Sequence, residues 1–325
     1  MDLEYSLPKG TFDILPNEPE TQDRWKASHR WHYVESVMRR LAHTYGYREI
    51  RTPIFEKTEL FIRGVGETSD IVSKEMYIFR DKADRSMTLR PEGTASVMRA
   101  FAQNSLHRLG SHHKFFYIGP FFRYDRPQAG RFRQFHQFGI EVVGNGEPDQ
   151  DFEVIELLYR LFCRLGLKNL TVLVNSLGDR RCRENYQQAL LVFLKPHFEA
   201  LSLESQRRFT KNPLRILDSK DEKERALLKN APSILDFLSD ASRRHFNSLC
   251  EYLTADAIPF QITSRLVRGL DYYNHTVFEI TSDSPKRQNT IGAGGRYDGL
   301  LPVVGGPDLP CIGFSTGIER ILQAM

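Results

Sequence analysis

Arginines are concentrated in one short polar segment of the chain. Residues 123–133 hold a single acid, Asp125, and four arginines: Arg123, Arg126, Arg131 and Arg133. A guanidinium group binds phosphate or carboxylate through two parallel hydrogen bonds, so this segment is a candidate phosphate clamp. Taken alone, the segment is equally well explained as the solvated tip of a hairpin.

A second candidate lies directly after this segment, in the stretch QFHQFGIEVV. In a strand the side chains alternate between two faces, which places Gln137, Gly139 and Glu141 together on one face. A buried glutamate needs a partner, and beside an open glycine it can accept hydrogen bonds from a cationic or N–H-bearing ligand. A structural salt bridge is the alternative explanation.

Three further segments contain residues able to do chemistry. The turn 88–95 (TLRPEGTA) leads toward a helix with Thr94 as a candidate N-cap. Arg268 precedes Gly269 and two tyrosines in 266–279, and Arg320 lies early in a C-terminal helix whose apolar face is formed by other residues. An ordinary capped turn, core aromatics and a surface arginine are the respective alternatives.

Composition limits the class of protein. The chain has 325 residues, 40% hydrophobic and 26% charged, with a formal net charge of +4, which is typical of a folded protein of about two domains. No apolar run approaches the roughly 18 residues of a membrane span, and the first residues lack a signal-peptide core, so we expect a cytoplasmic protein with no membrane association. The four cysteines are widely separated and form no CxxC pair, so neither disulfides nor a zinc site are expected. Signatures of Rossmann and P-loop nucleotide sites, GxGxxG and GxxxxGK[ST], are missing from the sequence.

The elements that must position these residues follow from apolar periodicity. Helical spacing predicts one amphipathic helix over 24–45, and the next apolar stretch predicts a strand over 47–55 that ends near a proline. Apolar, aromatic stretches predict antiparallel strands over 115–124 and 135–143, joined by the arginine-rich loop. Charged, leucine-rich sequence predicts helices over 176–257. Strand-like sequence resumes at position 260, and the chain ends in an expected strand, 311–314, followed by a helix.

These segments, in this order, resemble the histidyl-tRNA synthetase family of class II aminoacyl-tRNA synthetases. Tyr47–Glu56 resembles motif 1, Phe115–Glu141 motif 2 and Gly313–Arg320 motif 3. Leu266–Asn274 (LVRGLDYYN) and Ala293–Asp298 (AGGRYD) resemble the signatures of the histidine-specific family. The resemblance covers essentially the whole chain and is specific, because five motifs would have to coincide in order.

The resemblance implies an α+β fold. Its core is expected to be a mainly antiparallel six-stranded sheet flanked by helices, with a helical insertion. The implied divisions are a first part of the catalytic core at 1–175, an insertion domain at 176–257 and a second part of the core at 258–325. Motif 1 implies a homodimer.

The implied reaction joins L-histidine to ATP, giving histidyl adenylate and pyrophosphate, and then transfers histidine to the 3′ end of its tRNA. ATP would be used with Mg2+. The family carries a further anticodon-binding domain, whereas this sequence ends after motif 3. Either the sequence is the catalytic region of such an enzyme without that domain, or it belongs to a shorter relative. The shorter relative would be the synthetase-like regulatory subunit of ATP phosphoribosyltransferase, which binds histidine without charging tRNA.

Roles for individual residues are also implied by the resemblance. Arg123 and Arg268 would stabilise the α-phosphate from opposite sides, and Arg320 would pack on the adenine. The ATP site would comprise Arg123, Gln137 and Arg320. The histidine site would comprise Glu92, Thr94, Gln137, Glu141, Arg268, Tyr273 and Tyr297. The tRNA acceptor end would be contacted by Gln128, Arg131 and Arg133. No protein side chain is assigned to a metal.

Overall fold

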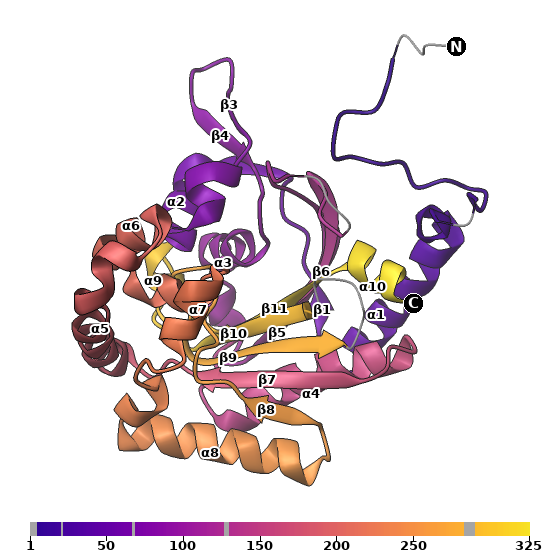
Figure 1. The fold of residues 1–325 in the computed structure, drawn as a ribbon. Helices are drawn as coiled ribbons and strands as arrows, with labels where there is room; N and C mark the ends of the chain where they lie inside the picture. The colour runs from indigo at the N-terminus through magenta and orange to yellow at the C-terminus, as the bar shows by residue number, and fades with distance from the viewer. Residues whose placement is uncertain (1–4, 21, 67–68, 127–129, 283–289) are drawn as a thin grey trace.

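An eight-stranded sheet forms the centre of the molecule (Figure 1). The computed structural model describes residues 5–20, 22–66, 69–126, 130–282 and 290–325. In spatial order the strands are β1 (Arg48–Glu49), β5 (His113–Phe122), β6 (Gln134–Val143), β11 (Cys311–Gly317), β10 (Thr290–Arg296), β9 (Asn274–Ser282), β7 (Leu170–Ser176) and β8 (Phe260–Ile262).

The expectation of a six-stranded sheet is wrong, because the sheet has eight strands and is mixed. The strands from β5 to β7 pair antiparallel, whereas β1 pairs parallel with β5 and β8 pairs parallel with β7 at the two edges. The edge strands have two and three residues. The sequence predicts strand character at both places, over 47–55 and from position 260, but strands this short carry too little periodic signal to reveal their pairing at the edges of the sheet.

The predicted antiparallel pair around the arginine-rich loop is confirmed. β5 and β6 pair without a break from His113 opposite Val143 to Phe122 opposite Gln134. The two strands therefore reach the loop together and hold its two ends side by side.

Helices surround this sheet and cover both of its faces. They are α1 (Ser28–Thr44), α2 (Thr58–Val65), α3 (Thr94–Gln103), α4 (Pro148–Arg164), α5 (Arg180–Leu194), α6 (Leu203–Lys211), α7 (Glu222–Leu228), α8 (Asp240–Ala255), α9 (Leu300–Val303) and α10 (Ile318–Ala324). Short 3-10 turns occur at Arg24–Lys26, Leu106–Leu109, Lys195–Ala200, Pro213–Asp218 and Ile234–Phe237, and a π-helical turn at Ile71–Glu75. Among the described residues, none of the helices combines the length and apolar character that crossing a membrane requires.

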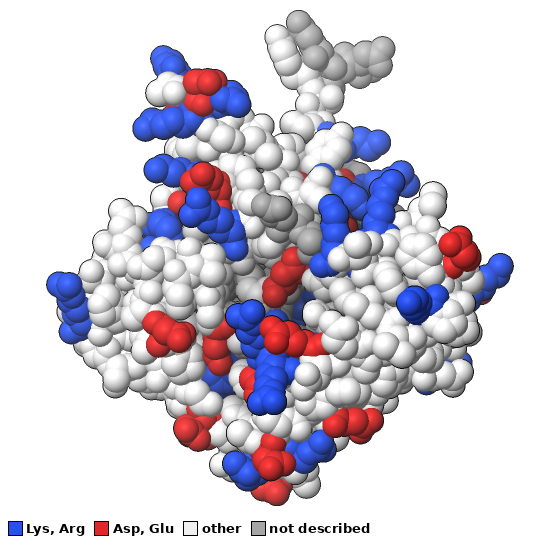
Figure 2. Space-filling model, turned by 90° about the vertical axis from the view of Figure 1, so that its left-hand side faces the viewer, with Lys and Arg blue, Asp and Glu red and all other residues white. Residues whose placement is uncertain are grey.

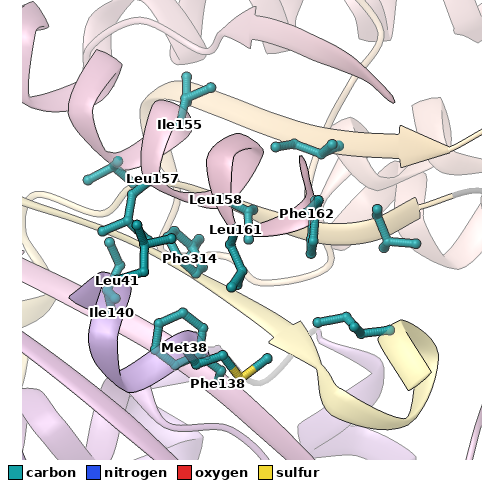
Figure 3. Packing of buried hydrophobic residues seen from close by; sticks show 14 of the residues in the cluster. Met38, Leu41, Phe138, Ile140, Ile155, Leu157, Leu158, Leu161, Phe162 and Phe314 are labelled. Carbon is teal, nitrogen blue, oxygen red and sulfur yellow. The ribbon is translucent and has the colours of Figure 1, made fainter. Parts of the chain in front are cut away.

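The main hydrophobic core fills one face of the sheet. Alternate residues of β6, Phe138, Ile140 and Val142, are fully buried there, as the strand period predicts. They pack with side chains of α1 and α4, whose apolar faces meet over the sheet (Figure 3). The opposite face of β6 is thus left for polar residues.

Two predicted segment boundaries are wrong. The helix predicted over 24–45 is broken at Ala27, whose extended backbone separates a 3-10 turn from α1. The strand predicted over 47–55 stops at Glu49, and the chain pairs again only from Phe55, in a separate small sheet. That sheet consists of β2 (Phe55–Lys57), β4 (Ser86–Leu89) and β3 (Ile78–Arg80), and its β3–β4 hairpin projects from the body of the molecule (Figure 1). Pro53, which has no backbone N–H to donate, lies within the gap.

The C-terminal boundary also differs from the prediction. The last strand, β11, continues to Gly317, so the final helix begins at Ile318 and not at Ser315. The extra strand residues pair with β6, where Gly317 lies opposite Gln137. This pairing carries the start of α10 to the edge of the polar face.

Candidate functional site

One large pocket of about 750 Å3 opens on the polar side of the sheet. Its walls come from the turn before α3, from β5 and β6, from the loop before β9, and from β10, β11 and α10. Charged side chains of both signs gather around a hollow in the face of the molecule shown in Figure 2. The predicted site residues that line the pocket are Glu92, Thr94, Arg123, Arg131, Gln137, Arg268, Tyr273, Tyr297 and Arg320.

Five of the described lining residues are arginines, and three of these come from distant parts of the sequence: Arg123, Arg268 and Arg320. The protein holds each of the three in place. Arg123 donates from Nε to the carbonyl of Pro91 at 2.8 Å, and its guanidinium lies over the ring of Phe135. Arg268 forms an ion pair with Glu279. Arg320 donates from Nη1 to the carbonyl of Thr290 at 3.0 Å. Fixed guanidinium groups around one pocket form a site for an anion with several negatively charged groups.

The position of Arg320 follows from the packing of α10. Ile318, Ile321 and Leu322 are buried in the main core, as the apolar spacing predicts. Arg320 therefore lies on a different face of the helix and lines the pocket. Burial lowers the pKa of Arg320, and the nearby Arg131 and Arg123 lower it further. An anionic ligand would relieve this repulsion.

The turn before α3 is capped in another way than predicted. Thr94 is the first residue of the helix and not its N-cap. The Glu92 carboxylate instead accepts from the backbone N–H groups of Thr94, at 2.7 Å, and Ala95, at 2.9 Å. Burial raises the pKa of Glu92, and these two N–H donors partly offset the rise. The cap fixes a carboxylate at the pocket wall and leaves the Thr94 hydroxyl free to point elsewhere.

Glu141 is fully buried at the centre of the sheet, behind the wall of the pocket. Its Oε1 accepts from the hydroxyls of Thr94, at 2.8 Å, and Tyr117, at 3.4 Å, and its Oε2 accepts from the hydroxyl of Tyr297. Burial raises the pKa of Glu141 to about 8, despite the opposing effect of these hydroxyl donors. All three donor side chains line the pocket, so they separate the carboxylate from it.

The open space expected beside Gly139 is absent, because the ring of Tyr117 fills it. A Cβ atom at Gly139 would lie 2.3 Å from that ring. Gly313 serves the same purpose on β11, since a Cβ there would lie 2.2 Å from the Glu141 carboxylate. These glycines therefore make room for protein side chains that surround Glu141.

Gln137, on β6, and Tyr273, at the end of the loop before β9, both line the pocket. Among the described residues, the buried Oε1 of Gln137 has no hydrogen-bond donor. The Tyr273 ring packs against that of Tyr272 with centroids 4.7 Å apart. A buried acceptor without a donor is costly in a folded protein, so Gln137 is well suited to bind a ligand N–H group.

The arginine-rich loop is only partly gathered at the pocket. Arg131 lines it and pairs with Asp125 at 3.0 Å. Arg133 instead stacks its guanidinium on the ring of Tyr124, 4.0 Å from the centroid. Gln128 lies outside the described residues.

Sequence reasoning missed several lining residues. Phe135 precedes Gln137 by two positions on β6, so one more step of the same period would have included it. Glu279 also lines the pocket, and as a single charge within the apolar stretch TVFEIT it could have been recognised as a candidate site residue from the sequence. Tyr117 lies directly opposite Gly139 on β5, a relation that only the register reveals.

Metal-binding residues are not grouped in the part of the chain that the structure describes, where no cluster of three or more His, Cys, Asp or Glu residues could hold an ion. Cys163 is exposed, and Cys182 and Cys311 are buried as free thiols.

Comparisons with known proteins agree with one another. Residues 22–321 match a family model described as histidyl-tRNA synthetase. A curated histidine–tRNA ligase from Protochlamydia amoebophila is 57% identical over 323 residues, covering 99% of this chain and 76% of that protein. The crystal structure of apo S. aureus histidyl-tRNA synthetase has a TM-score of 0.79 at 38% identity and covers 98% of this chain and 73% of that one.

A Bacillus halodurans structure described as an ATP phosphoribosyltransferase regulatory subunit/histidyl-tRNA synthetase is also similar. Its TM-score is 0.70, and the match covers 100% of this chain and 84% of that one. At 22% identity, it shows a shared fold alone.

The close fit around Tyr117 yields a stability prediction. Gly139→Ala should lower the free energy of unfolding by about 1–3 kcal/mol, because the new methyl group overlaps the Tyr117 ring. Urea denaturation measures the change. Gly146→Ala is the matched control, since its Cβ would meet Pro310 at an ordinary 3.6 Å. Equal stability of the two variants would contradict the proposed role of Gly139.

Proposed function

Because this chain belongs to the histidyl-tRNA synthetase family, we propose that it activates L-histidine with ATP and transfers the histidyl group to the 3′ end of its tRNA. The observation that carries the proposal is the gathering of Arg123, Arg268 and Arg320 around one pocket with Gln137 and Tyr273. Arginines suit the phosphates of ATP, and the polar groups suit an amino acid.

The first step joins two anions and therefore requires charge neutralisation. A carboxylate oxygen of histidine attacks the α-phosphorus, and the bond from that phosphorus to the pyrophosphate oxygen breaks. We assign Arg123 and Arg268 to the α-phosphate, where they would stabilise the charge that develops in the transition state. Arg320 would bind the adenine and the terminal phosphates, with Gln137 contributing to the ATP site. Mg2+ would accompany ATP as part of that substrate.

For the amino acid, we assign Glu92, Thr94 and Gln137 to the amino and carboxylate groups of histidine. Glu141, Tyr273 and Tyr297 would read the imidazole. Three hydroxyls surround the Glu141 carboxyl on the pocket side, so an imidazole nitrogen would reach it by replacing one of them. Buried polar groups of this kind reject a side chain that leaves them unpaired, which would give selectivity for histidine.

The tRNA acceptor end would meet the arginine-rich loop through Gln128, Arg131 and Arg133. The helices of 176–257 would form an insertion domain over the acceptor stem, between core parts at 1–175 and 258–325. Phosphate contacts would make this binding weaken steeply with salt. We propose that these steps occur in the cytoplasm.

We further propose a homodimer whose interface includes α1 and residues 47–56. Ile54 and Phe55 support it, because these large apolar side chains are 45% and 50% exposed. Contact with a second copy would remove them from water.

The regulatory-subunit alternative is not favoured. Relatives that are 50–57% identical over nearly the whole chain are named histidine–tRNA ligases. The residues that adenylation would use are also all present: Glu92, Arg123, Gln137, Glu141, Arg268, Tyr273 and Arg320.

Exchange of labelled pyrophosphate into ATP tests the proposal without tRNA. With Mg2+ and a panel of amino acids, we expect exchange with histidine alone. Absence of exchange, with histidine still bound, would instead support the regulatory-subunit function.

Arg268→His should reduce the rate of this exchange by about 100-fold or more and change histidine binding little. The reason is that the lost charge acts mainly in the transition state. Arg265→His is the matched control, because Arg265 is an exposed arginine on the same loop. An exchange rate unchanged from that of the unmodified protein would remove Arg268 from the mechanism.

Histidine affinity should be greatest between about pH 6.5 and 8. In that range the Glu141 carboxyl, with its pKa of about 8, is protonated, and the imidazole, with a pKa near 6.5, is neutral. Below this range the imidazole is protonated and must release a proton to bind beside the protonated Glu141 carboxyl, so affinity falls. Above it Glu141 is ionised and must take up a proton when histidine binds, so affinity falls again. Calorimetric titration across pH 6–8.5 measures both limits.

Glu141→Gln separates the carboxyl from other titrating groups. We expect histidine affinity to fall by about 10–100-fold, selectivity to weaken, and the decline between pH 7.5 and 8.5 to become shallower. If selectivity over other amino acids survives intact, Glu141 does not read the imidazole.

A further inference from the structure

Two assigned residues, Arg268 and Tyr273, lie on a segment without regular structure. Residues 263–273 connect β8 to β9 and form neither helix nor strand. Such a segment has no ladder or helical hydrogen bonds to fix its backbone, so other parts of the chain must supply the partners. The positions of the Arg268 and Tyr273 side chains therefore depend on those partners.

The helical segment, residues 176–257, supplies three hydrogen-bond donors, which reach residues 269, 271 and 273 of the loop. Arg215 donates from Nη1 to the carbonyl of Gly269 at 3.1 Å. Asn212 donates to the carboxylate of Asp271 at 2.8 Å. The third donor is Arg183, whose Nη1 donates to the carbonyl of Tyr273 at 2.9 Å.

Arg215 is itself firmly held. It is 5% exposed, and its Nη2 donates to the carboxylate of Asp70, another lining residue, at 2.8 Å. Its own carbonyl accepts from Arg208 at 3.2 Å. Asp70 directly precedes the π-helical turn Ile71–Glu75, whose ends also line the pocket. One guanidinium thus joins three segments that are far apart in the sequence.

We propose that Arg215, assisted by Asn212 and Arg183, positions the loop that carries Arg268 and Tyr273. The helical segment is then part of the machinery of adenylate formation as well as a candidate tRNA contact. This inference rests on the proposed function, and specifically on the assignment of Arg268 to the α-phosphate.

The contacts explain why the effect is indirect. Arg215 lines the pocket, but each of its terminal nitrogens donates to the protein, Nη1 to Gly269 and Nη2 to Asp70, so the guanidinium holds the loop backbone. A displacement of about 1 Å in a reacting group can cost about 100-fold in rate. Loss of the bond to Gly269 frees the residue next to Arg268, and the rate of chemistry should suffer more than ground-state binding.

Arg215→Met and Asn212→Ala test the proposal in pyrophosphate exchange with the full chain. We expect kcat to fall by about 10–100-fold for Arg215→Met and by about 3–10-fold for Asn212→Ala, with KM for histidine and ATP within about 3-fold. Arg207→Met, at an exposed arginine on α6, is the matched control and should match the unmodified protein. A large rise in KM for ATP at unchanged kcat would overturn the proposal, because it indicates direct phosphate binding by Arg215.

A double-mutant cycle separates positioning from a general loss of structure. If Arg215 acts through Arg268, Arg215→Met should add little to the defect of Arg268→His. Multiplying defects would overturn the proposal, as would an unchanged kcat in both Arg215→Met and Asn212→Ala. Should Arg215→Met fail to fold, as seen by thermal unfolding, Asn212→Ala combined with Arg268→His gives the same comparison. Lack of exchange in the unmodified protein would instead reject the proposed function itself.

Discussion

The site depends on one buried carboxylate, that of Glu141, at the centre of the sheet. A carboxyl group buried in that position needs hydrogen-bond partners, and three hydroxyls from separate parts of the chain supply them. Thr94 comes from the start of α3, Tyr117 from β5, and Tyr297 directly follows β10. Satisfying Glu141 therefore fixes the relative positions of three walls of the pocket.

One face of β6 packs in the hydrophobic core, and the other carries residues of the site. Phe138, Ile140 and Val142 belong to the main core with α1 and α4, so the strand is anchored by apolar burial. The alternate residues are then free to be polar, and Gln137 and Glu141 stand on a rigid support. Glycines at 139 and 313 give the space that these polar groups and Tyr117 need.

The arginines Arg123 and Arg268 are held differently, because each is fixed by its own hydrogen bond or ion pair. Arg123 is tied to a carbonyl before α3, and Arg268 is paired with Glu279 on β9. Arg268 lies on an irregular loop, so its placement depends on side chains that reach it from the helical segment. The chemistry assigned to the sheet is in this way linked to helices that are distant in the sequence.

The sequence by itself determined the parts that repeat or alternate. The period of two in residues 135–143 predicted which side chains of β6 are polar, and the spacing of Ile318, Ile321 and Leu322 predicted the buried face of α10. Motif order predicted the family. Only the tertiary structure decided the eight-stranded mixed sheet, the Glu92 cap, the Tyr117 ring beside Gly139 and the contacts of Arg215 with Gly269. The physical reason is that periodicity reports local burial, whereas these features depend on register and on contacts between segments far apart in the chain.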